Sequence, residues 1–322
     1  MQYRKLGWTN LELSTIGLGT WAHGGGNWQF SWGSQDDADS IATIEKALDA
    51  GINWIDTAAV YGFGHAEEVA GRALKKIGKR PIIATKCGRV WDADGRIYGR
   101  LTRESVRKEC EDSLRRLEVE VIDLYQIHRP DPENELEESW EAISELVEEG
   151  KIRYAGVSNF NVAQMDHLRG IHPIASLQPP YSMLNRDAEN ELLKYCAASQ
   201  IGVVVYSPMQ KGLLTGKVTP EWVAGLPEDD HRRRDPRFQE PWLSNNIQLV
   251  ERLKEIALRN RLTVSQLAIA WVLRRPEVTS AIVGARRPEQ IEETVGAGDV
   301  TLSEEDQRAI EDLLSEYALK VG

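Results

Sequence analysis

The chain has 322 residues with a formal net charge of −11, which argues against nucleic acid and anionic membranes as general partners because a phosphate-tracking surface needs a basic face. Hydrophobic residues make up 41% and charged residues 28%, as is typical of a globular chain with a sizeable core. No apolar run approaches the roughly 18 residues of a membrane span and the N-terminus lacks the apolar stretch of a signal peptide, so we expect a cytoplasmic protein.

Short apolar runs alternate with amphipathic helical patterns along the whole chain. The expected strands cover residues 14–19, 53–56, 81–86, 121–127, 152–157, 174–177, 202–206 and 279–283. The expected helices cover 34–50, 66–75, a segment that starts after Thr102, 136–149, 161–168, 187–198, 247–260, 265–274, 288–294 and 303–319. Ser34 and Thr102 are the expected caps of the first and third helices.

Alternating strands and helices predict a parallel sheet, and eight such units favour a closed (β/α)8 TIM barrel over an open doubly wound sheet. At roughly 150 residues per domain the length alone would suggest two domains, but a barrel accommodates it as one. We therefore expect a single domain over residues 1–322. Residues 207–245 interrupt the alternation without clear secondary structure, and a loop of this length is usually functional or disordered.

Residues 17–22, Gly-Leu-Gly-Thr-Trp-Ala, match the G-x-G-x-x-A fingerprint of a dinucleotide-binding Rossmann unit. That fingerprint requires a helix to begin inside the motif, so that its N-terminus meets the pyrophosphate. Three glycines and two tryptophans follow here instead, and no helix is expected before about residue 35. The sequence therefore disfavours a Rossmann unit.

Polar, glycine or tyrosine residues stand at the end of every expected strand. In an α/β barrel the C-terminal strand ends form one mouth, where catalytic residues lie. The residues at or just after the strand ends are Gly19, Thr20, Trp21, Asp56, Tyr61, Lys86, His128, Ser158, Asn159, Gln178, Tyr206, Ser207, Gly284, Arg286 and Arg287. We therefore expect a functional site at this mouth.

Asp56, Tyr61, Lys86 and His128 form a set suited to proton transfer. An isolated tyrosine has a pKa of about 10, too high to exchange protons readily at neutral pH. A nearby ammonium would lower the pKa of Tyr61, and a carboxylate would keep that ammonium charged. Tyr61 could then act as general acid to a carbonyl oxygen that accepts a hydride, with His128 holding the carbonyl by a hydrogen bond.

Each of these four residues alone has an ordinary structural explanation. A strand-end aspartate can cap the next helix, a tyrosine can pack in a partly buried position, and a lysine can extend its ammonium to water. A histidine ahead of Arg129 and Pro130 can simply be a satisfied polar residue. The presence of all four at one mouth, in this order, favours the catalytic interpretation.

The sequence resembles the aldo-keto reductase family, and the similarity covers essentially the whole chain. The matching motifs are GINWIDTAAVYG at 51–62, ATK at 84–86, IDLYQIH at 122–128 and GKIRYAGVSNF at 150–160. The stretch YSPMQKGLLTGK at 206–217 is similar to the bacterial branch that includes general-stress reductases. The resemblance implies a barrel enzyme that reduces aldehydes and ketones with NADPH.

The resemblance also implies a role for each matching residue. It makes Tyr61 the proton donor, with Lys86 and Asp56 setting its pKa and His128 orienting the substrate, while the hydride passes directly from the nicotinamide to the carbonyl carbon. The residues implied at the nicotinamide are Ser158, Asn159 and Gln178 for the carboxamide and Tyr206 for the ring. The cofactor would lie extended across the mouth without a Rossmann unit, lined by Gly19, Thr20 and Trp21.

Two arginines at the start of the helix at 288–294 favour NADP as the cofactor. Guanidinium groups and free helix N–H groups both bind a phosphate dianion, here the 2′-phosphate. The resemblance makes Arg286 the contact rather than Arg287, and solvated arginines are the alternative. The further residues that it places at the cofactor are Ser207, Gly212, Lys217, Gly284, Gln290 and Glu293, with the loop 207–245 folding over it.

The substrate pocket is expected to be apolar and aromatic, with walls supplied by Trp21, Trp28, Trp32 and Trp91. Some of these rings could instead cover the outer helices. Arg129 follows His128 where relatives often have an aromatic residue, which suggests a polar or anionic aldehyde. The run Arg232–Arg234 could clamp the cofactor, but the sequence favours a solvated charge run.

Two other classes of function stay open. A non-enzymatic regulatory subunit could keep the barrel and the cofactor, as the potassium-channel β subunits of this superfamily partly do. A metal-dependent hydrolase is disfavoured because the histidines include no His-x-His pair, and we expect no metal. Three scattered cysteines without a Cys-x-x-Cys pair argue against a disulfide framework. We expect a monomer whose partner is a small carbonyl compound.

Overall fold

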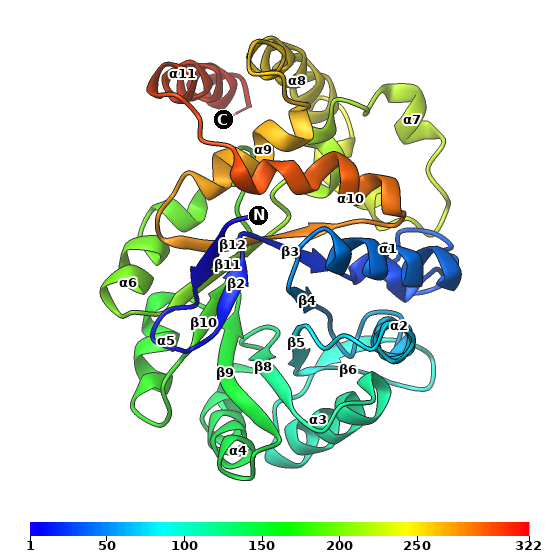
Figure 1. Ribbon diagram of the computed structural model, residues 1–322, viewed down its shortest axis with the longest axis vertical. Helices are drawn as coiled ribbons and strands as arrows, with labels where there is room; N and C mark the ends of the chain where they lie inside the picture. The colour runs from blue at the N-terminus through cyan, green and yellow to red at the C-terminus, as the bar shows by residue number, and fades with distance from the viewer. Residues whose placement is uncertain (322) are drawn as a thin grey trace.

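The computed structural model describes residues 1–321 and shows the closed parallel barrel that the sequence predicts (Figure 1). Strand β12 pairs with β3, which closes the ring. The barrel strands are β3 (Ile16–Gly19), β4 (Trp54–Asp56), β5 (Ile82–Cys87), β8 (Ile122–Ile127), β9 (Ile152–Ser158), β10 (Ser176–Gln178), β11 (Gly202–Tyr206) and β12 (Val278–Gly284). The (β/α)8 fold is confirmed; the last residue of the expected domain, Gly322, lies outside the described residues.

The helices are α1 (Asp37–Asp49), α2 (His65–Ile77), α3 (Arg103–Leu117), α4 (Leu136–Glu148), α5 (Val162–Arg169), α6 (Leu192–Ala198), α7 (Pro220–Ala224), α8 (Trp242–Arg259), α9 (Val264–Leu273), α10 (Pro288–Val295) and α11 (Glu304–Val321). Most of them form a ring around the barrel, while α8 and α11 pack together outside α9 and α10 (Figure 1). Thr102 caps α3 as expected. The expected cap Ser34 is wrong, because α1 begins three residues later and the carboxylate of Asp36 accepts its first N–H groups.

Two antiparallel hairpins precede or interrupt the alternation and were not expected from the sequence. The first expected strand divides at Thr15: its start belongs to the hairpin of β1 (Tyr3–Lys5) and β2 (Glu12–Ser14). Apolar side chains of this hairpin pack with the inward residues of the barrel and close its lower end; the cluster includes Leu6, Leu11, Leu13, Trp54, Leu124 and Val204. The second hairpin, β6 (Arg89–Trp91) with β7 (Ile97–Gly99), follows β5.

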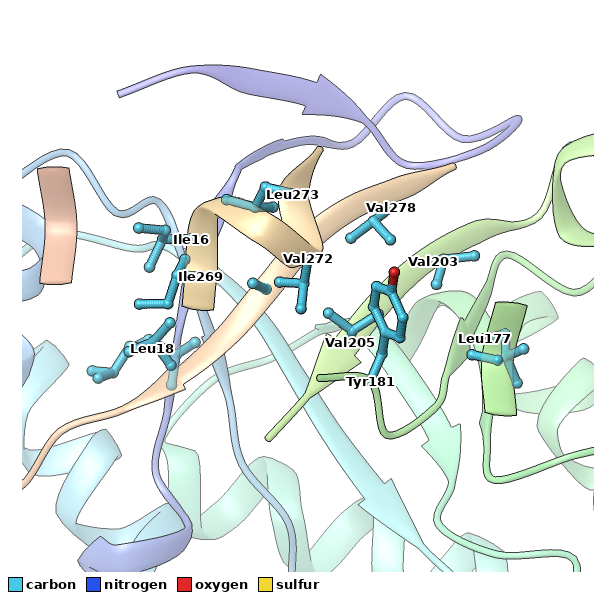
Figure 2. Close-up of a cluster of buried hydrophobic side chains, with 14 of the residues drawn as sticks. Ile16, Leu18, Leu177, Tyr181, Val203, Val205, Ile269, Val272, Leu273 and Val278 are labelled. Carbon is cyan, nitrogen blue, oxygen red and sulfur yellow. The ribbon is translucent and has the colours of Figure 1, made fainter. Parts of the chain in front are cut away.

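The larger hydrophobic core lies between the barrel and its helices. Outward residues of the strands pack there because successive side chains of a strand point to opposite faces. Figure 2 shows one part of this core, where strand residues meet α9; it includes Ile16, Leu18, Val203, Val205, Val278, Ile269 and Val272. This packing fixes the strands, so the inward positions at their ends are held rigidly.

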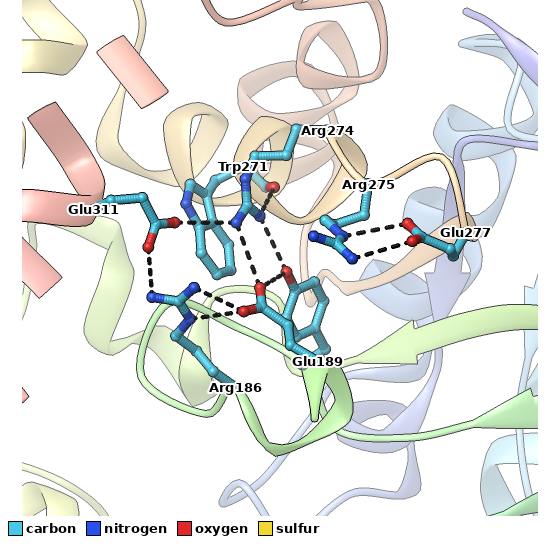
Figure 3. Close-up of polar contacts among 8 residues, drawn as sticks. Arg186, Glu189, Trp271, Arg274, Arg275, Glu277 and Glu311 are labelled. Carbon is cyan, nitrogen blue, oxygen red and sulfur yellow. Dashed lines mark hydrogen bonds and ion pairs between the residues drawn. The ribbon is translucent and has the colours of Figure 1, made fainter. Parts of the chain in front are cut away.

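A charged cluster fastens the C-terminal helix to the barrel (Figure 3). Arg186 pairs with Glu189 and with Glu311 of α11, each at 2.7 Å. Arg274 contacts the same two carboxylates at 3.4 and 3.1 Å, and its guanidinium lies 3.7 Å from the ring centroid of Trp271. These contacts are structural, and they hold α11 against α9.

The segment 207–245 contains secondary structure that the sequence did not indicate. It includes the 3-10 helices Gln210–Thr215, His231–Arg234 and Pro236–Phe238 as well as α7, and α8 begins at Trp242 rather than near residue 247. The long loop expected after the seventh strand is present, but the expectation that it has no secondary structure is wrong. Asp235 and Thr219 cap two of these short helices through their side chains. Helices of one or two turns are too short to give the periodic apolar pattern by which a sequence indicates a helix.

Candidate active site

Strand alternation brings the four candidate catalytic residues to one mouth. Trp54 and Ala84 belong to the apolar cluster inside the barrel. Asp56 and Lys86 come two positions later on the same strands, so their side chains also point inward, one layer higher. His128 directly follows β8, and its backbone N–H donates to the carbonyl of Cys87 at the end of β5. The predicted convergence at the strand ends is thus present in the structure.

Asp56 and Lys86 form a buried ion pair at the centre of the mouth. The Lys86 ammonium donates to Asp56 Oδ1 at 2.6 Å and to the carbonyl of Thr57 at 2.9 Å. The Lys86 side chain is 0% exposed and the Asp56 side chain is 4% exposed. Gln178 Nε2 donates to the second carboxylate oxygen at 2.9 Å. The pair is therefore fixed on every side, which a buried ion pair needs to be stable.

The Tyr61 ring lies beside this pair. Its backbone is held by a turn, in which the Tyr61 N–H donates to the carbonyl of Ala58 and the N–H of Ala66 donates to the Tyr61 carbonyl. The Lys86 ammonium is 5.3 Å from the ring centroid, and the His128 ring meets Tyr61 edge to face at a centroid distance of 5.9 Å. All four predicted residues are therefore brought together.

The local electrostatics keep the phenol protonated and the imidazole neutral. Burial raises the pKa of Tyr61 well above its usual value, Asp56 raises it further, and Arg129 opposes this. That direction is opposite to the one expected from the sequence. Burial lowers the pKa of Lys86, while Asp56 counteracts it. Burial and then the charges of Lys86 and Arg129 lower the pKa of His128 well below its usual range. The tyrosine is thus held in its acid form.

The residues expected at the nicotinamide form a connected polar row. Ser158 Oγ donates to the carbonyl of Gln178 at 2.9 Å, and Tyr206 Oη donates to Asn159 Oδ1 at 2.8 Å. Asn159 has a positive φ of 63° and its amide donates to the His128 carbonyl at 3.0 Å. Ser207 directly follows Tyr206, also with a positive φ. Amide and hydroxyl groups beside the half-buried phenol ring of Tyr206 are chemically suited to a carboxamide-bearing aromatic ring.

The first strand end serves the site without any Rossmann geometry. Only a four-residue 3-10 helix, Trp21–Gly24, follows β3, and the first α-helix begins at Asp37. Thr20 is buried, and both its N–H and its hydroxyl donate to the Asp56 carbonyl. Gly17 lies against the Trp54 ring, where a Cβ would come within 2.1 Å of ring carbon. Gly17 is therefore needed so that β3 can pack against the Trp54 ring, and not for the binding of a pyrophosphate.

Arg286 is held firmly at the opposite side of the mouth. Its Nε donates to Gln35 Oε1 at 2.7 Å, and its two terminal nitrogens donate to the carbonyls of Trp32 and Ser34. Gly284, two residues earlier, is exposed, and a Cβ there would meet nothing closer than the Gly19 carbonyl oxygen at 3.9 Å. Open space thus adjoins a fixed guanidinium group at the end of β12.

The other residues expected near the phosphates and the adenosine contact one another. Lys217 pairs with Glu293 at 2.6 Å, and Gln290 Oε1 accepts the backbone N–H of Arg286 at 2.7 Å. Gly212 has a φ of 101°, and its nearest side chain is that of Arg232. The structure therefore brings Lys217 to Glu293 of α10 and Gln290 to Arg286, while Gly212 lies beside Arg232. Lys217 faces a carboxylate rather than the arginines.

Two of the four tryptophans expected at the pocket contact Tyr61, and the other two pack on neighbouring rings. Trp21 stacks on the Tyr61 ring at 6.2 Å and Trp28 lies 6.3 Å from it. Trp32 packs edge-on against Trp21, and Trp91 meets Phe63 at 5.4 Å. A cavity of about 850 Å³ is lined by aromatic rings and by charged groups, among them Trp28, Phe63, Trp91, Asp92, Asp229 and Arg234. These rings stand at the site and not on the outer helices.

The arginine run is exposed at Arg233 and Arg234, as the sequence suggested, but not at Arg232. Arg232 is 7% exposed, forms an ion pair with Asp230 at 2.6 Å and lies over the rings of Trp32 and Trp222. Arg234 donates to the Gln29 carbonyl at 2.8 Å. Because Trp32 and Gln29 both lie in the loop after β3, these contacts join the segment 207–245 to that loop. A guanidinium group is attracted to the face of a tryptophan ring.

Two residues at the mouth were missed by the sequence argument. Gln126 points inward two positions before His128, and its buried Nε2 has no hydrogen-bond partner. The strand alternation would have identified it. His231 stacks on Trp21 at a centroid distance of 4.8 Å, and burial lowers its pKa to about 4. It comes from the segment without periodic pattern, so no sequence signal indicated it.

Neither a membrane helix nor a metal cluster occurs among the described residues. No helix within residues 1–321 combines the length and the apolar character needed to cross a bilayer. In the same part of the chain, no three histidine, cysteine, aspartate or glutamate side chains gather where they could hold a metal ion.

Comparison with known proteins gives concordant matches. The model of the aldo/keto reductase family matches residues 15–315. An aldo-keto reductase of Bacillus subtilis, YhdN, is 42% identical over 98% of this chain and 94% of its own length. The NADH-specific methylglyoxal reductase of Escherichia coli is 38% identical over 94% of both chains. The solved glycerol dehydrogenase of Gluconobacter oxydans superposes with a TM-score of 0.89 at 38% identity, covering 98% of this chain and 95% of that one.

Proposed function

The chain belongs to the aldo/keto reductase family, and we propose that it reduces small aldehydes and ketones to alcohols, reversibly and with NADPH. The observation that carries this proposal is the arrangement of Tyr61 beside the buried Lys86–Asp56 pair and the edge of His128. Relatives named methylglyoxal reductase and glycerol dehydrogenase act on a carbonyl or an alcohol, which supports the same class of reaction.

The chemistry divides between the cofactor and the chain. NADPH, when bound, supplies the hydride for the carbonyl carbon. Tyr61 donates its phenolic proton to the carbonyl oxygen as negative charge develops there. The Lys86 ammonium stabilises the phenolate that remains, and Asp56 keeps that ammonium charged. His128 is neutral and can donate a hydrogen bond to the same oxygen, which orients the carbonyl.

The donor groups on both sides of the mouth fit a nicotinamide cofactor. Ser158, Asn159 and Gln178 offer amide and hydroxyl groups for the carboxamide, and Tyr206 offers a ring face. Arg286 offers a fixed guanidinium beside the open space at Gly284. The segment 207–245 lies against the loop after β3, where it would cover the phosphates between these two ends.

The direct test is reduction of a panel of neutral and charged aldehydes by the purified protein with NADPH. We expect oxidation of the cofactor that depends on the aldehyde. A protein that binds NADPH but oxidises it at the rate of the substrate-free control across the panel would instead be the regulatory subunit. Failure to bind either nicotinamide cofactor would refute both functions.

Arg286→Ala tests the choice of cofactor. We expect the Kd for NADPH to rise about 10- to 100-fold, because a charge-assisted contact with the 2′-phosphate is lost, and the Kd for NADH to stay within about twofold. Fluorescence titration with both cofactors measures this. Arg287→Ala is the matched control, since its neighbouring guanidinium is expected to contribute little. Equal wild-type affinities for NADPH and NADH would contradict the NADP assignment, and the E. coli relative shows that NADH use occurs at this similarity.

Arg129→Ala tests the substrate class. The Arg129 side chain is exposed, has no ion pair or side-chain hydrogen bond among the described residues, and carries a charge felt by Tyr61 and His128. We propose that it favours carbonyl compounds with an anionic group. The wild type should have a kcat/KM for a carboxylate-bearing aldehyde about 10-fold above that for its neutral amide, and the variant should lose this preference. Arg89→Ala, which removes a guanidinium already paired with Asp131, is the control. An unchanged preference in Arg129→Ala would refute the assignment.

A further inference from the structure

Glu67 is a buried carboxylate that belongs to none of the roles described so far. It lies in the first turn of α2 and is 0% exposed. Its Oε1 accepts the hydroxyl hydrogen bond of Thr85 at 2.5 Å, and its Oε2 accepts from Arg116 Nε at 2.7 Å. Buried glutamates are rare unless they are paired, and this one uses both oxygens on groups from two different elements.

These contacts join the two elements that carry the proton-transfer residues. Thr85 precedes Lys86 on β5, so the Thr85 side chain points out toward α2 while Lys86 points into the barrel. At the other end, the Ala66 N–H, one residue before Glu67, donates to the Tyr61 carbonyl at 3.2 Å. The Glu67 side chain therefore ties the strand of Lys86 to the first turn of α2, and the backbone of that turn bonds to Tyr61.

Arg116 holds the same junction from α3. Its side chain lies over Gly64, where a Cβ would come within 2.7 Å of it, and Gly64 is the residue from which α2 begins. Gly71, on the next turns of α2, approaches the Arg116 carbonyl so closely that a Cβ there would lie 2.5 Å from it. The start of α2 is thus fixed between β5 and α3, and Glu67 is the group that bonds to both.

Two carboxylates near this junction favour the charged form of Lys86. Asp56, from β4, and Glu67, from α2, both raise the pKa of Lys86 against its burial. Facing Glu67 are Arg116 and a second carboxyl, Glu109, both from α3. Glu109 accepts the Gly88 N–H at 3.0 Å, and burial raises its pKa to about 7. Glu109 therefore lies against the end of β5, and it is not among the main groups that shift the pKa of Lys86.

We propose that Glu67 is a positioning residue, which ties α2 to β5 so that the Tyr61 phenol and the Lys86 ammonium keep their spacing. Its negative charge also supports the charged form of Lys86, as that of Asp56 does. The inference rests on the proposed carbonyl reduction. It adds a residue that touches neither substrate nor cofactor and acts through two residues that do.

The test uses the full-length protein and a neutral aldehyde over a range of pH. In Glu67→Gln we expect kcat to fall about 10-fold, while the KM for the aldehyde and the Kd for NADPH stay within about twofold. We also expect the alkaline fall of kcat to move down by about one pH unit, because removing a negative charge makes it easier for Lys86 to lose its proton. The double variant Glu67→Gln with Arg116→Met should show the same shift without a buried unpaired cation, and it replaces the single variant if that one does not fold.

Two matched variants separate the tie from the charge. Thr85→Val removes only the hydroxyl of the link, so it should lower kcat and leave the alkaline limb in place. Glu109→Gln removes another buried carboxyl, which reaches from α3 to the end of β5, and should change neither kcat nor the limb. These two variants and the wild type have the same Tyr61, Lys86 and cofactor residues.

The outcomes distinguish this inference from the proposed function. A wild type that reduces no aldehyde refutes the function. If the wild type is active, and the Glu67→Gln variants are less stable but keep the wild-type kcat and alkaline limb, then Glu67 has only a structural role. That result overturns the inference. A limb that shifts equally in Glu109→Gln overturns it too, because any nearby carboxyl would then produce the effect.

Discussion

Tyr61→Phe is expected to lower the kcat for aldehyde reduction by about 10²- to 10⁴-fold, the usual contribution of a general acid. The variant removes one oxygen from a ring that keeps its neighbours Trp21, Lys86 and His128. The Kd for NADPH should stay within about twofold, because the phenol is expected to meet the substrate and not the cofactor. The loss should therefore appear in the chemical step.

Single-turnover and steady-state rates, together with cofactor titration, measure this prediction. Tyr125→Phe is the matched control: Tyr125 is fully buried and its pKa is likewise raised well above its usual value, but its hydroxyl bonds to the Val106 carbonyl behind the barrel. That variant should turn over at the wild-type rate. Wild-type turnover by Tyr61→Phe would show that another group, or water, delivers the proton.

The sequence predicted those parts of the site that follow from the two-residue alternation of side chains along a strand. Trp54 and Asp56, like Ala84 and Lys86, stand two residues apart, and a period of two is enough to place one in the core and the other at the mouth. The barrel followed from eight strand–helix units in the same way. Residues that long-range contacts alone bring together, such as His231 beside Trp21, leave no such periodic trace.

The direction of the Tyr61 pKa shows another limit of sequence reasoning. The neighbours of Tyr61 were identified correctly, but burial outweighs them and raises the pKa. Burial depends on the packing of Trp21 and Trp28 around the phenol, which a list of residue types does not contain. The same holds for Arg286, whose bonds to Gln35 and two carbonyls depend on the path of the loop after β3.

Lys86→Met should lower both stability and turnover, and the two losses are separable. Removing the ammonium leaves the Asp56 carboxylate buried without its cation, and breaking a buried pair in this way costs about 3–5 kcal/mol of unfolding free energy. Turnover should fall at least about 100-fold, because the charge that stabilises the Tyr61 phenolate is gone. Urea unfolding and the kcat for an aromatic aldehyde measure the two effects.

The double variant Lys86→Met with Asp56→Asn identifies which loss is catalytic. With both charges removed, the amide at position 56 can still accept the hydrogen bond from Gln178 Nε2, so most of the lost unfolding free energy should return. Turnover should stay as low as in Lys86→Met, since no ammonium stands over the Tyr61 ring. If turnover returned together with stability, Lys86 would serve only to neutralise a buried carboxylate, and Tyr61 would have to lose its proton without a neighbouring cation.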